Sequence, residues 1–174
     1  MNGSFVHYMK NTLNAYEFSW KEGPGTTHVA AVLYGPAIAA VLNDAMWSEF
    51  KISDVLAARY QDTFTANTPP RSTNPFLVNR TTIPVTGKSS DPLYVNDSVT
   101  GLELRGASFF VCNNALAGLA QEFASPSIDR ATVEAIRLKL TQNFAGGAML
   151  IPAGVAAINA CQEQRFTYLN GSGA

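Results

Sequence analysis

The chain has 174 residues, of which 47% are hydrophobic and 14% are charged. This length predicts one domain over residues 1–174, and the apolar fraction excludes wholesale disorder. Twelve basic and thirteen acidic residues give a net charge of −1, so nothing favours nucleic acid as a partner. Ordinary soluble domains carry about 25% charged residues. The low charge here indicates a surface covered by partner subunits or by Ser, Thr and Asn.

The sequence has neither a membrane span nor a secretory signal of the usual form. No apolar run approaches the roughly 18 residues that a membrane-spanning helix needs, and the N-terminus lacks a basic start followed by an apolar run. We therefore expect a cytoplasmic protein, or a periplasmic one if a leader is missing from this chain. Two cysteines, Cys112 and Cys161, do not make a disulfide framework.

The first third of the chain alternates helix and strand. Apolar residues at three- and four-residue steps predict a helix over 4–20, with one face formed by Phe5, Met9, Leu13, Tyr16 and Trp20. The apolar run 28–34 predicts a buried strand that Gly35-Pro36 ends. Helices are predicted over 36–47 and 53–60, and Pro36 suits the first turn of a helix.

Residues 62–105 interrupt this pattern with five prolines and many Thr, Asn and Ser. A structureless loop of this length is unusual in a compact domain. We therefore predict an ordered arm, with short strands at its apolar clusters 76–78, 83–85 and 93–95, that lies on its own body or on a neighbour. The alternative is a mobile surface loop.

The regular alternation resumes after the arm. Residues 107–112 predict a strand, followed by a helix to 123 that Asn113 or Asn114 caps. Asp129 is expected to cap a longer helix whose inner face includes Phe144. A strand over 148–151, a helix from 154 and a last short strand over 166–169 complete the chain.

The alternation of strands and helices predicts an α/β fold with a mostly parallel sheet and helices on both faces. Such folds usually open with a strand, but this chain opens with a helix. The sheet therefore lacks a strand or borrows one from the arm. An uncovered sheet edge is a pairing liability, and together with the low charge it predicts an oligomer.

Three strand ends are candidates for a binding site, because ligands of open α/β sheets bind beyond the carboxyl ends of the strands. The peptide N–H groups of these turns favour an anion. The candidate residues are Tyr34, Gly35, Pro36, Cys112, Asn113, Asn114, Pro152, Ala153 and Gly154.

Cys112 is the strongest candidate for a chemically reactive residue. It ends a strand and starts a helix, where the positive end of the helix dipole favours a thiolate, and a thiolate is a nucleophile. The alternative is a small buried hydrophobe after two phenylalanines. Either reading places the sulfur at the carboxyl end of the sheet.

The other polar residues give weaker signals. The amide of Asn11 could reach the strand ends, but a polar helix face is the simpler reading. Cys161 is expected to pack on a helix face. His7 and His28 lack partners at metal spacing, and no Walker, G-x-S-x-G or G-x-G-x-x-G motif is present. We predict no cofactor and no metal.

Four blocks of this sequence resemble the DsrE/DsrF-like superfamily of small α/β proteins, over about two thirds of the chain. The blocks are residues 11–16 (NTLNAY), 32–37 (VLYGPA), 110–116 (FVCNNAL), and 151–155 (IPAGV) with 162–168 (QEQRFTY). The arm at 62–105 and the missing opening strand depart from the common pattern.

The resemblance implies a flavodoxin-like three-layer sandwich and a trimeric or hexameric assembly. For active members it implies a persulfide on a cysteine after a strand, the kind of position that Cys112 occupies. Two functions follow. One is a sulfur carrier, or sulfurtransferase, that uses Cys112 with a sulfur donor or acceptor protein as partner. The other is a non-catalytic assembly or small-ligand-binding module in which Cys112 is structural.

Overall fold

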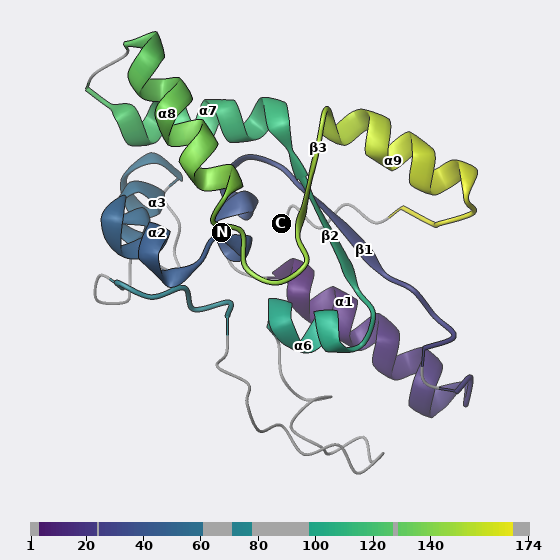
Figure 1. Cartoon of the computed structure of the whole chain (residues 1–174). Helices are drawn as coiled ribbons and strands as arrows, with labels where there is room; N and C mark the ends of the chain where they lie inside the picture. The colour runs from purple at the N-terminus through teal and green to yellow at the C-terminus, as the bar shows by residue number, and fades with distance from the viewer. Residues whose placement is uncertain (1–3, 24, 61–70, 78–97, 127–128, 169–174) are drawn as a thin grey trace.

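A three-stranded parallel sheet organises the part of the chain that the structure describes. The structure is a computed structural model and describes residues 4–23, 25–60, 71–77, 98–126 and 129–168. The strands are β1 (Ala30–Leu33), β2 (Ser108–Cys112) and β3 (Met149–Ile151), in the order β1-β2-β3 (Figure 1). The predicted α/β class with a parallel sheet is confirmed.

The central strand β2 divides its side chains between two environments, because successive residues of a strand point to opposite faces. Phe109 and Val111 are buried in the main core. Phe110 lines a groove beside α9 (Gly154–Glu163), the helix that contacts β1 and β2. Cys112 follows Phe110 by two residues and therefore shares the α9 face of the sheet.

The first helix is shorter than predicted. α1 (Ser4–Asn14) is an α-helix, and its last turn widens into the π-helix η1 (Ala15–Ser19). Val6, Met9 and Leu13 are the buried residues of α1, whereas Trp20 is exposed and packs edge-on against Tyr16. The wider turn ends the 3.6-residue periodicity, so the predicted inner face is wrong at Trp20.

The predicted helix 36–47 is two helices. The 3₁₀ helix η2 (Gly35–Val41) ends before Leu42, which pairs in an isolated antiparallel bridge with Phe144. Asn43 then caps α2 (Asp44–Glu49) by accepting the N–H of Met46 at 3.1 Å. The bridge explains both this break and the place of Phe144, which lies outside the helix it was predicted to join.

Two parts of the arm are described, and both lie on the body of the chain. Residues 71–77 form a strap of turns in which Phe76 is buried and packs near Trp47. α6 (Val99–Leu104) is a helix that contacts α1. The strand predicted at 76–78 is wrong at 76–77, where the chain leaves a turn at 75–76; residue 78 and the strands predicted at 83–85 and 93–95 lie outside the described residues.

The remaining helices follow the predicted order. α3 (Ile52–Tyr60) confirms the predicted helix 53–60, and α7 (Asn113–Ala124) packs on α8 (Arg130–Thr141). Asp129 caps α8 as predicted, because its Oδ2 accepts the N–H of Thr132 at 2.8 Å. The strand predicted over 166–169 is wrong at 166–168, where the chain is irregular because the N–H of Phe166 bonds to the carbonyl of Cys161.

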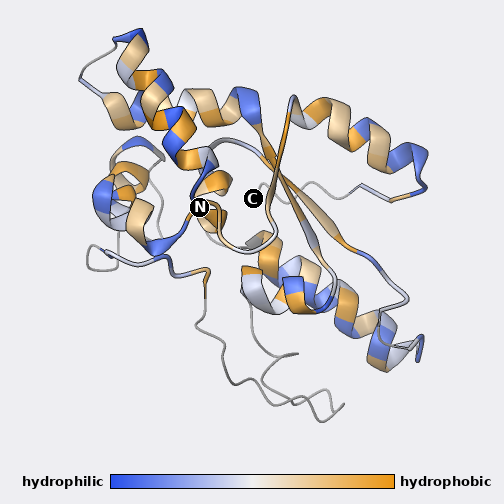
Figure 2. Cartoon of the chain, in the orientation of Figure 1, coloured by the Kyte–Doolittle hydropathy of each residue, from blue (hydrophilic) through white to orange (hydrophobic). Residues whose placement is uncertain are grey.

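Figure 2 shows hydrophobic residues concentrated in the three strands. The described parts of the arm add no fourth strand to the sheet. Within the same residues, no helix combines the length and the apolar character needed to cross a membrane.

Candidate functional site

The sulfur of Cys112 lies at the end of β2, next to α7, the end of β3 and the start of α9. Cys112 ends β2 and precedes α7, and it pairs with Ile151 at the end of β3. Its Sγ accepts the backbone N–H of Gly154, the first residue of α9, at 3.2 Å. The structure thus brings two of the three predicted strand ends together around one sulfur atom.

Gly154 allows this close approach because it has no side chain. A Cβ at this position would lie 3.2 Å from Cγ1 of Val32 and 3.4 Å from Cβ of Cys112. Ala153 precedes it in an extended conformation (φ −147°, ψ 132°), and Pro152 is exposed. The turn 152–154 therefore presents the N–H group of Gly154 to the sulfur.

The surroundings of Cys112 are uncharged. The sequences of the three strands contain no ionisable group besides Cys112 itself, and the first turns of α7 and α9 contain no acidic residue. Cys112 is 3% exposed and does not belong to the main hydrophobic core. Its sulfur is therefore buried at the carboxyl end of the sheet, with the peptide N–H of Gly154 as a polar neighbour.

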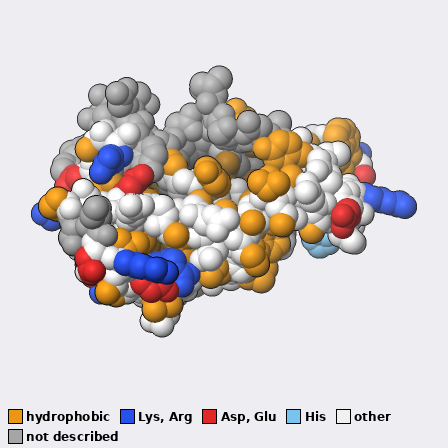
Figure 3. Space-filling model, turned by 90° about the horizontal axis from the view of Figure 1, so that it is seen from above, with side chains coloured by type: hydrophobic (Ala, Val, Ile, Leu, Met, Phe, Trp, Pro, Cys, Tyr) orange, Lys and Arg blue, Asp and Glu red, His pale blue; other side chains and the backbone are white. Residues whose placement is uncertain are grey.

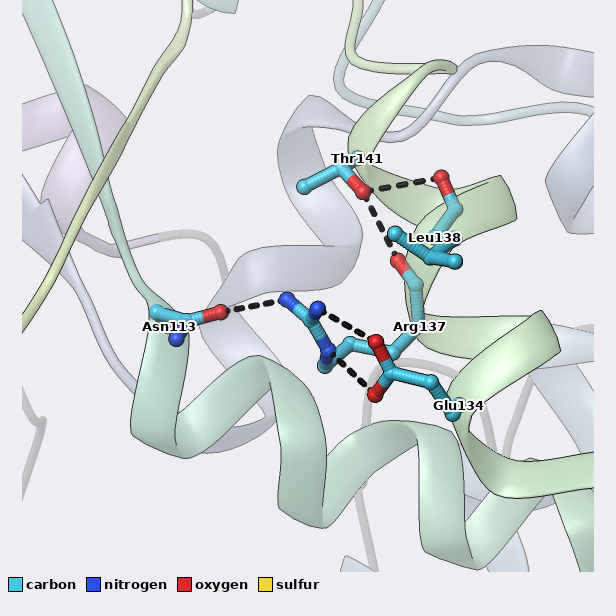
Figure 4. Close-up of polar contacts among 5 residues, drawn as sticks. All are labelled: Asn113, Glu134, Arg137, Leu138 and Thr141. Atoms are coloured by element: carbon cyan, nitrogen blue, oxygen red, sulfur yellow. Dashed lines mark hydrogen bonds and ion pairs between the residues drawn. The ribbon is translucent and has the colours of Figure 1, made fainter. Parts of the chain in front are cut away.

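Asn113 is held in place by α8. Its Oδ1 accepts a hydrogen bond of 2.8 Å from Nη1 of Arg137, which also forms two hydrogen bonds with Glu134 (Figure 4). A guanidinium group only donates hydrogen bonds, so the amide oxygen of Asn113 must face Arg137. These bonds hold the pKa of Glu134 below its ordinary value and raise that of Arg137.

Neither asparagine acts as the predicted helix cap. Cys112 occupies the N-cap position of α7 without a side-chain cap bond, and Asn113 is the first residue of the helix. The side chain of Asn113 is used instead by Arg137, while Asn114 is exposed on the outside of α7. The contact with Arg137 was not predicted, because only the local Glu134–Arg137 spacing is visible in the sequence.

The third predicted strand end, residues 34–36 after β1, lies beside Cys112 in the sheet. Leu33 pairs with Val111. The next residues, Tyr34 and Cys112, are therefore neighbours on the α9 face of the sheet. Tyr34 is 71% exposed, Gly35 has a positive φ of 54°, and Pro36 lies in the first turn of η2. This end forms a border of the site, and no contact with the sulfur is recorded for its described residues.

Asn11 is not brought to this site. α1 lies at the opposite end of the molecule from the carboxyl ends of the strands (Figure 1). Asn11 is exposed there, with its Nδ2 2.9 Å from Nε2 of His7. The reading of a polar helix face accounts for both residues.

Cys161 lines a separate groove at the amino end of the sheet. The groove has a volume of about 330 Å³, and His28, Ser108, Phe110 and Phe166 also line it. Cys161 is half-buried there, on the same side of α9 as Gly154 but two turns further along. Across the described ranges, no group of three or more His, Cys, Asp or Glu side chains is arranged to hold a metal ion.

Comparison with known proteins returns no match to a family model, a curated protein or a solved structure.

Proposed function

We propose that this chain is a small sulfur carrier in which Cys112 accepts a sulfane sulfur as a persulfide and passes it to a partner thiol. The hydrogen bond of 3.2 Å from Gly154 N–H to the Cys112 sulfur carries this proposal. The resemblance to DsrE/DsrF-like proteins supports it. A flavodoxin-like three-layer sandwich and a trimeric or hexameric assembly belong to the same proposal.

Two helix N-termini lie next to the Cys112 sulfur. The N-termini of α7 and α9 both meet at Cys112, and the positive ends of helix dipoles stabilise an anion. No acidic side chain in the first turn of either helix opposes this effect. A thiolate is the form of cysteine that attacks sulfur.

The transfer step needs no oxidant or cofactor. The Cys112 thiolate attacks the outer sulfur of a persulfide donor, R–S–SH. A new S–S bond forms on Cys112 while the donor S–S bond breaks, and the electron pair leaves with the thiolate R–S⁻. The reverse reaction, with a partner thiolate as the attacking group, unloads the carrier.

Access to the sulfur requires a local movement of the chain, because Cys112 is 3% exposed. Gly154 contacts the sulfur through its N–H, and Pro152 of the same turn is exposed. We therefore expect a bulky thiol reagent to modify the half-buried Cys161 faster than Cys112.

Sulfur loading tests the proposal directly. The Cys161→Ser variant, treated with inorganic polysulfide and then analysed by intact mass, should gain one sulfur atom that a reductant removes. The gain should map to the peptide containing Cys112 and should vanish in a Cys112→Ser/Cys161→Ser variant. A folded Cys161→Ser protein that gains no sulfur contradicts the proposal.

A specific observation also favours the second function, a non-catalytic assembly module. Val155 and Tyr34 are 73% and 71% exposed, and Met149 and Leu150 of β3 are exposed as well. Figure 3, which views the molecule from above, shows hydrophobic side chains spread between the charged ones on this side. The two functions are compatible, because a sulfur site can lie at a subunit interface.

A further inference from the structure

The outer edge of β3 carries exposed apolar side chains. β3 is the last strand in the order β1-β2-β3, and none of the described strands pairs with its outer side. Met149 and Leu150 are 49% and 40% exposed. Because successive residues of a strand point to opposite faces, the sheet is uncovered on both faces at this edge. At the other edge, the side chains of β1 are half-buried or, at Leu33, buried.

β3 is held on the body of the chain at both of its ends. Just before it, the N–H of Gly147 donates to Oε1 of Glu103 on α6 at 3.0 Å. Shortly after it, the N–H of Gly154 donates to the sulfur of Cys112 at 3.2 Å. A strand that is already fixed in its extended shape loses little conformational freedom on pairing, so less free energy of association is lost.

The sequence of this edge indicates what it pairs with. Residues 148–155 (AMLIPAGV) contain no charged side chain, whereas charges, lysine above all, are a common protection of edge strands that stay unpaired. An interface between two copies related by a two-fold axis places one surface against itself, so charges along it would repel each other. An uncharged apolar edge avoids this repulsion and matches its own copy. These features favour a second copy of this chain over a charged partner.

We propose that two copies of this chain pair antiparallel through β3, about a two-fold axis that passes beside Leu150. Pairing all three residues of the strand places Leu150 opposite Leu150 of the second copy, and Met149 opposite Ile151 of the second copy. The two sheets then form one continuous sheet with apolar cross-strand pairs, which stabilise a sheet. The axis also places the two copies of Glu103 at opposite ends of the paired strands, so these carboxylates do not face each other.

This pairing rests on the proposed assembly and is independent of the sulfur chemistry of Cys112. A two-fold axis requires an even number of chains. Between the two assemblies proposed for this chain, it therefore favours the hexamer over the trimer, and a simple dimer also satisfies it.

Disulfide cross-linking of the whole chain tests the position of the axis. In a Cys112→Ser/Cys161→Ser background, Leu150→Cys should form a covalent dimer on mild oxidation. Opposed residues of an antiparallel pair have Cβ atoms about 4.5–5.5 Å apart, close to the separation that a disulfide needs. Trp20→Cys is the control, as Trp20 is 62% exposed at the other end of the molecule. At micromolar protein, Leu150→Cys should cross-link at least about tenfold faster, because paired thiols have an effective concentration in the millimolar range.

A second pair of variants tests the direction of the strands and stays informative if Leu150→Cys does not fold. In the same background, co-expressed Met149→Cys and Ile151→Cys chains should give a mixed covalent dimer. Each alone should cross-link slowly, because antiparallel pairing separates each of these residues from its own copy. A mixed dimer that forms no faster than the Trp20→Cys dimer would overturn the pairing.

Light scattering on the parent chain separates this pairing from assembly in general. The expected mass is that of an even number of chains. A trimer, or an oligomer in which Leu150→Cys folds but does not cross-link faster than Trp20→Cys, would overturn the β3 pairing and leave the proposed assembly standing. A monomeric parent chain would overturn both.

Discussion

The buried amide of Asn74 shows how much a single side chain can decide in this fold. It donates to three backbone carbonyls at the end of η2, and its own Oδ1 accepts the N–H of Phe76 at 2.8 Å. Ala39, Ala40 and Leu42 are fully buried, and of their carbonyls only that of Ala39 has a second side-chain donor among the described residues, the indole N–H of Trp47 at 2.9 Å. Asn74 therefore stabilises both the strap and the break in the helix before α2.

Asn74→Ala should destabilise the protein by about 3 kcal/mol, because buried carbonyls and a peptide N–H lose their hydrogen-bond partner together. Urea denaturation followed by circular dichroism measures the change. Asn114→Ala is the control, since Asn114 is exposed on α7, and it should change the free energy of unfolding by less than about 0.5 kcal/mol. Equal stabilities of the two variants would refute this role.

At the scale of elements, α8 depends on its cap and on its contact with α7. Oδ2 of Asp129 accepts hydrogen bonds from both the hydroxyl and the N–H of Thr132, each at 2.8 Å. The hydroxyl bond, followed by the N–H bond, holds the pKa of Asp129 below its ordinary 3.8. At the other face of the helix, Arg137 ties α8 to Asn113 at the start of α7.

The cap predicts a defined pH dependence. Because the pKa of Asp129 is lowered in the folded state, its charge stabilises the fold above the ordinary pKa of 3.8, and this contribution is lost as the pH falls through the lowered value. The parent chain should thus be more stable than Asp129→Ala at pH 7, and the difference should shrink as the pH falls below 3.8.

Thermal unfolding of both proteins over this pH range measures the effect of the cap. Asp129→Asn is the control, because it keeps a cap oxygen but cannot titrate, and its stability relative to Asp129→Ala should be independent of pH. A constant difference between the parent chain and Asp129→Ala at all pH values would contradict the assignment.

At the scale of the whole molecule, the single chain leaves apolar surface uncovered. Met149 and Leu150 are 49% and 40% exposed on β3, which forms one edge of the described sheet. Val155, at the start of α9, is 73% exposed. Exposed apolar patches of this kind mark interaction sites, and an open strand edge invites pairing with another chain.

We expect the protein to form an oligomer through this surface. Size-exclusion chromatography with light scattering should give a mass above that of one chain. Met149→Lys should reduce it, because a lysine on an edge strand opposes pairing. Trp20→Lys is the control, as Trp20 is exposed beside η1 at the other end of the molecule. A monomeric parent chain at micromolar concentration would contradict this expectation.

The limits of sequence-based prediction are visible at particular residues. The alternation of elements, the Asp129 cap and the position of Cys112 at a strand end were all correctly predicted, because each depends on neighbours within a few residues. The break at Leu42 and the failure of the strand 166–168 were not predicted. Leu42 leaves the helix to pair with Phe144, a residue about one hundred positions away.

Some features of the candidate site follow from the sequence alone, and others are visible only in the tertiary structure. The sequence alone determined that three strand-to-helix turns exist and that one of them carries a thiol. Only the tertiary structure decided that Gly154 reaches the sulfur, that Arg137 holds Asn113, and that Asn11 lies at the far end. The physical reason is that periodicity and capping are local, whereas hydrogen bonds between elements depend on strand register and helix packing across the whole chain.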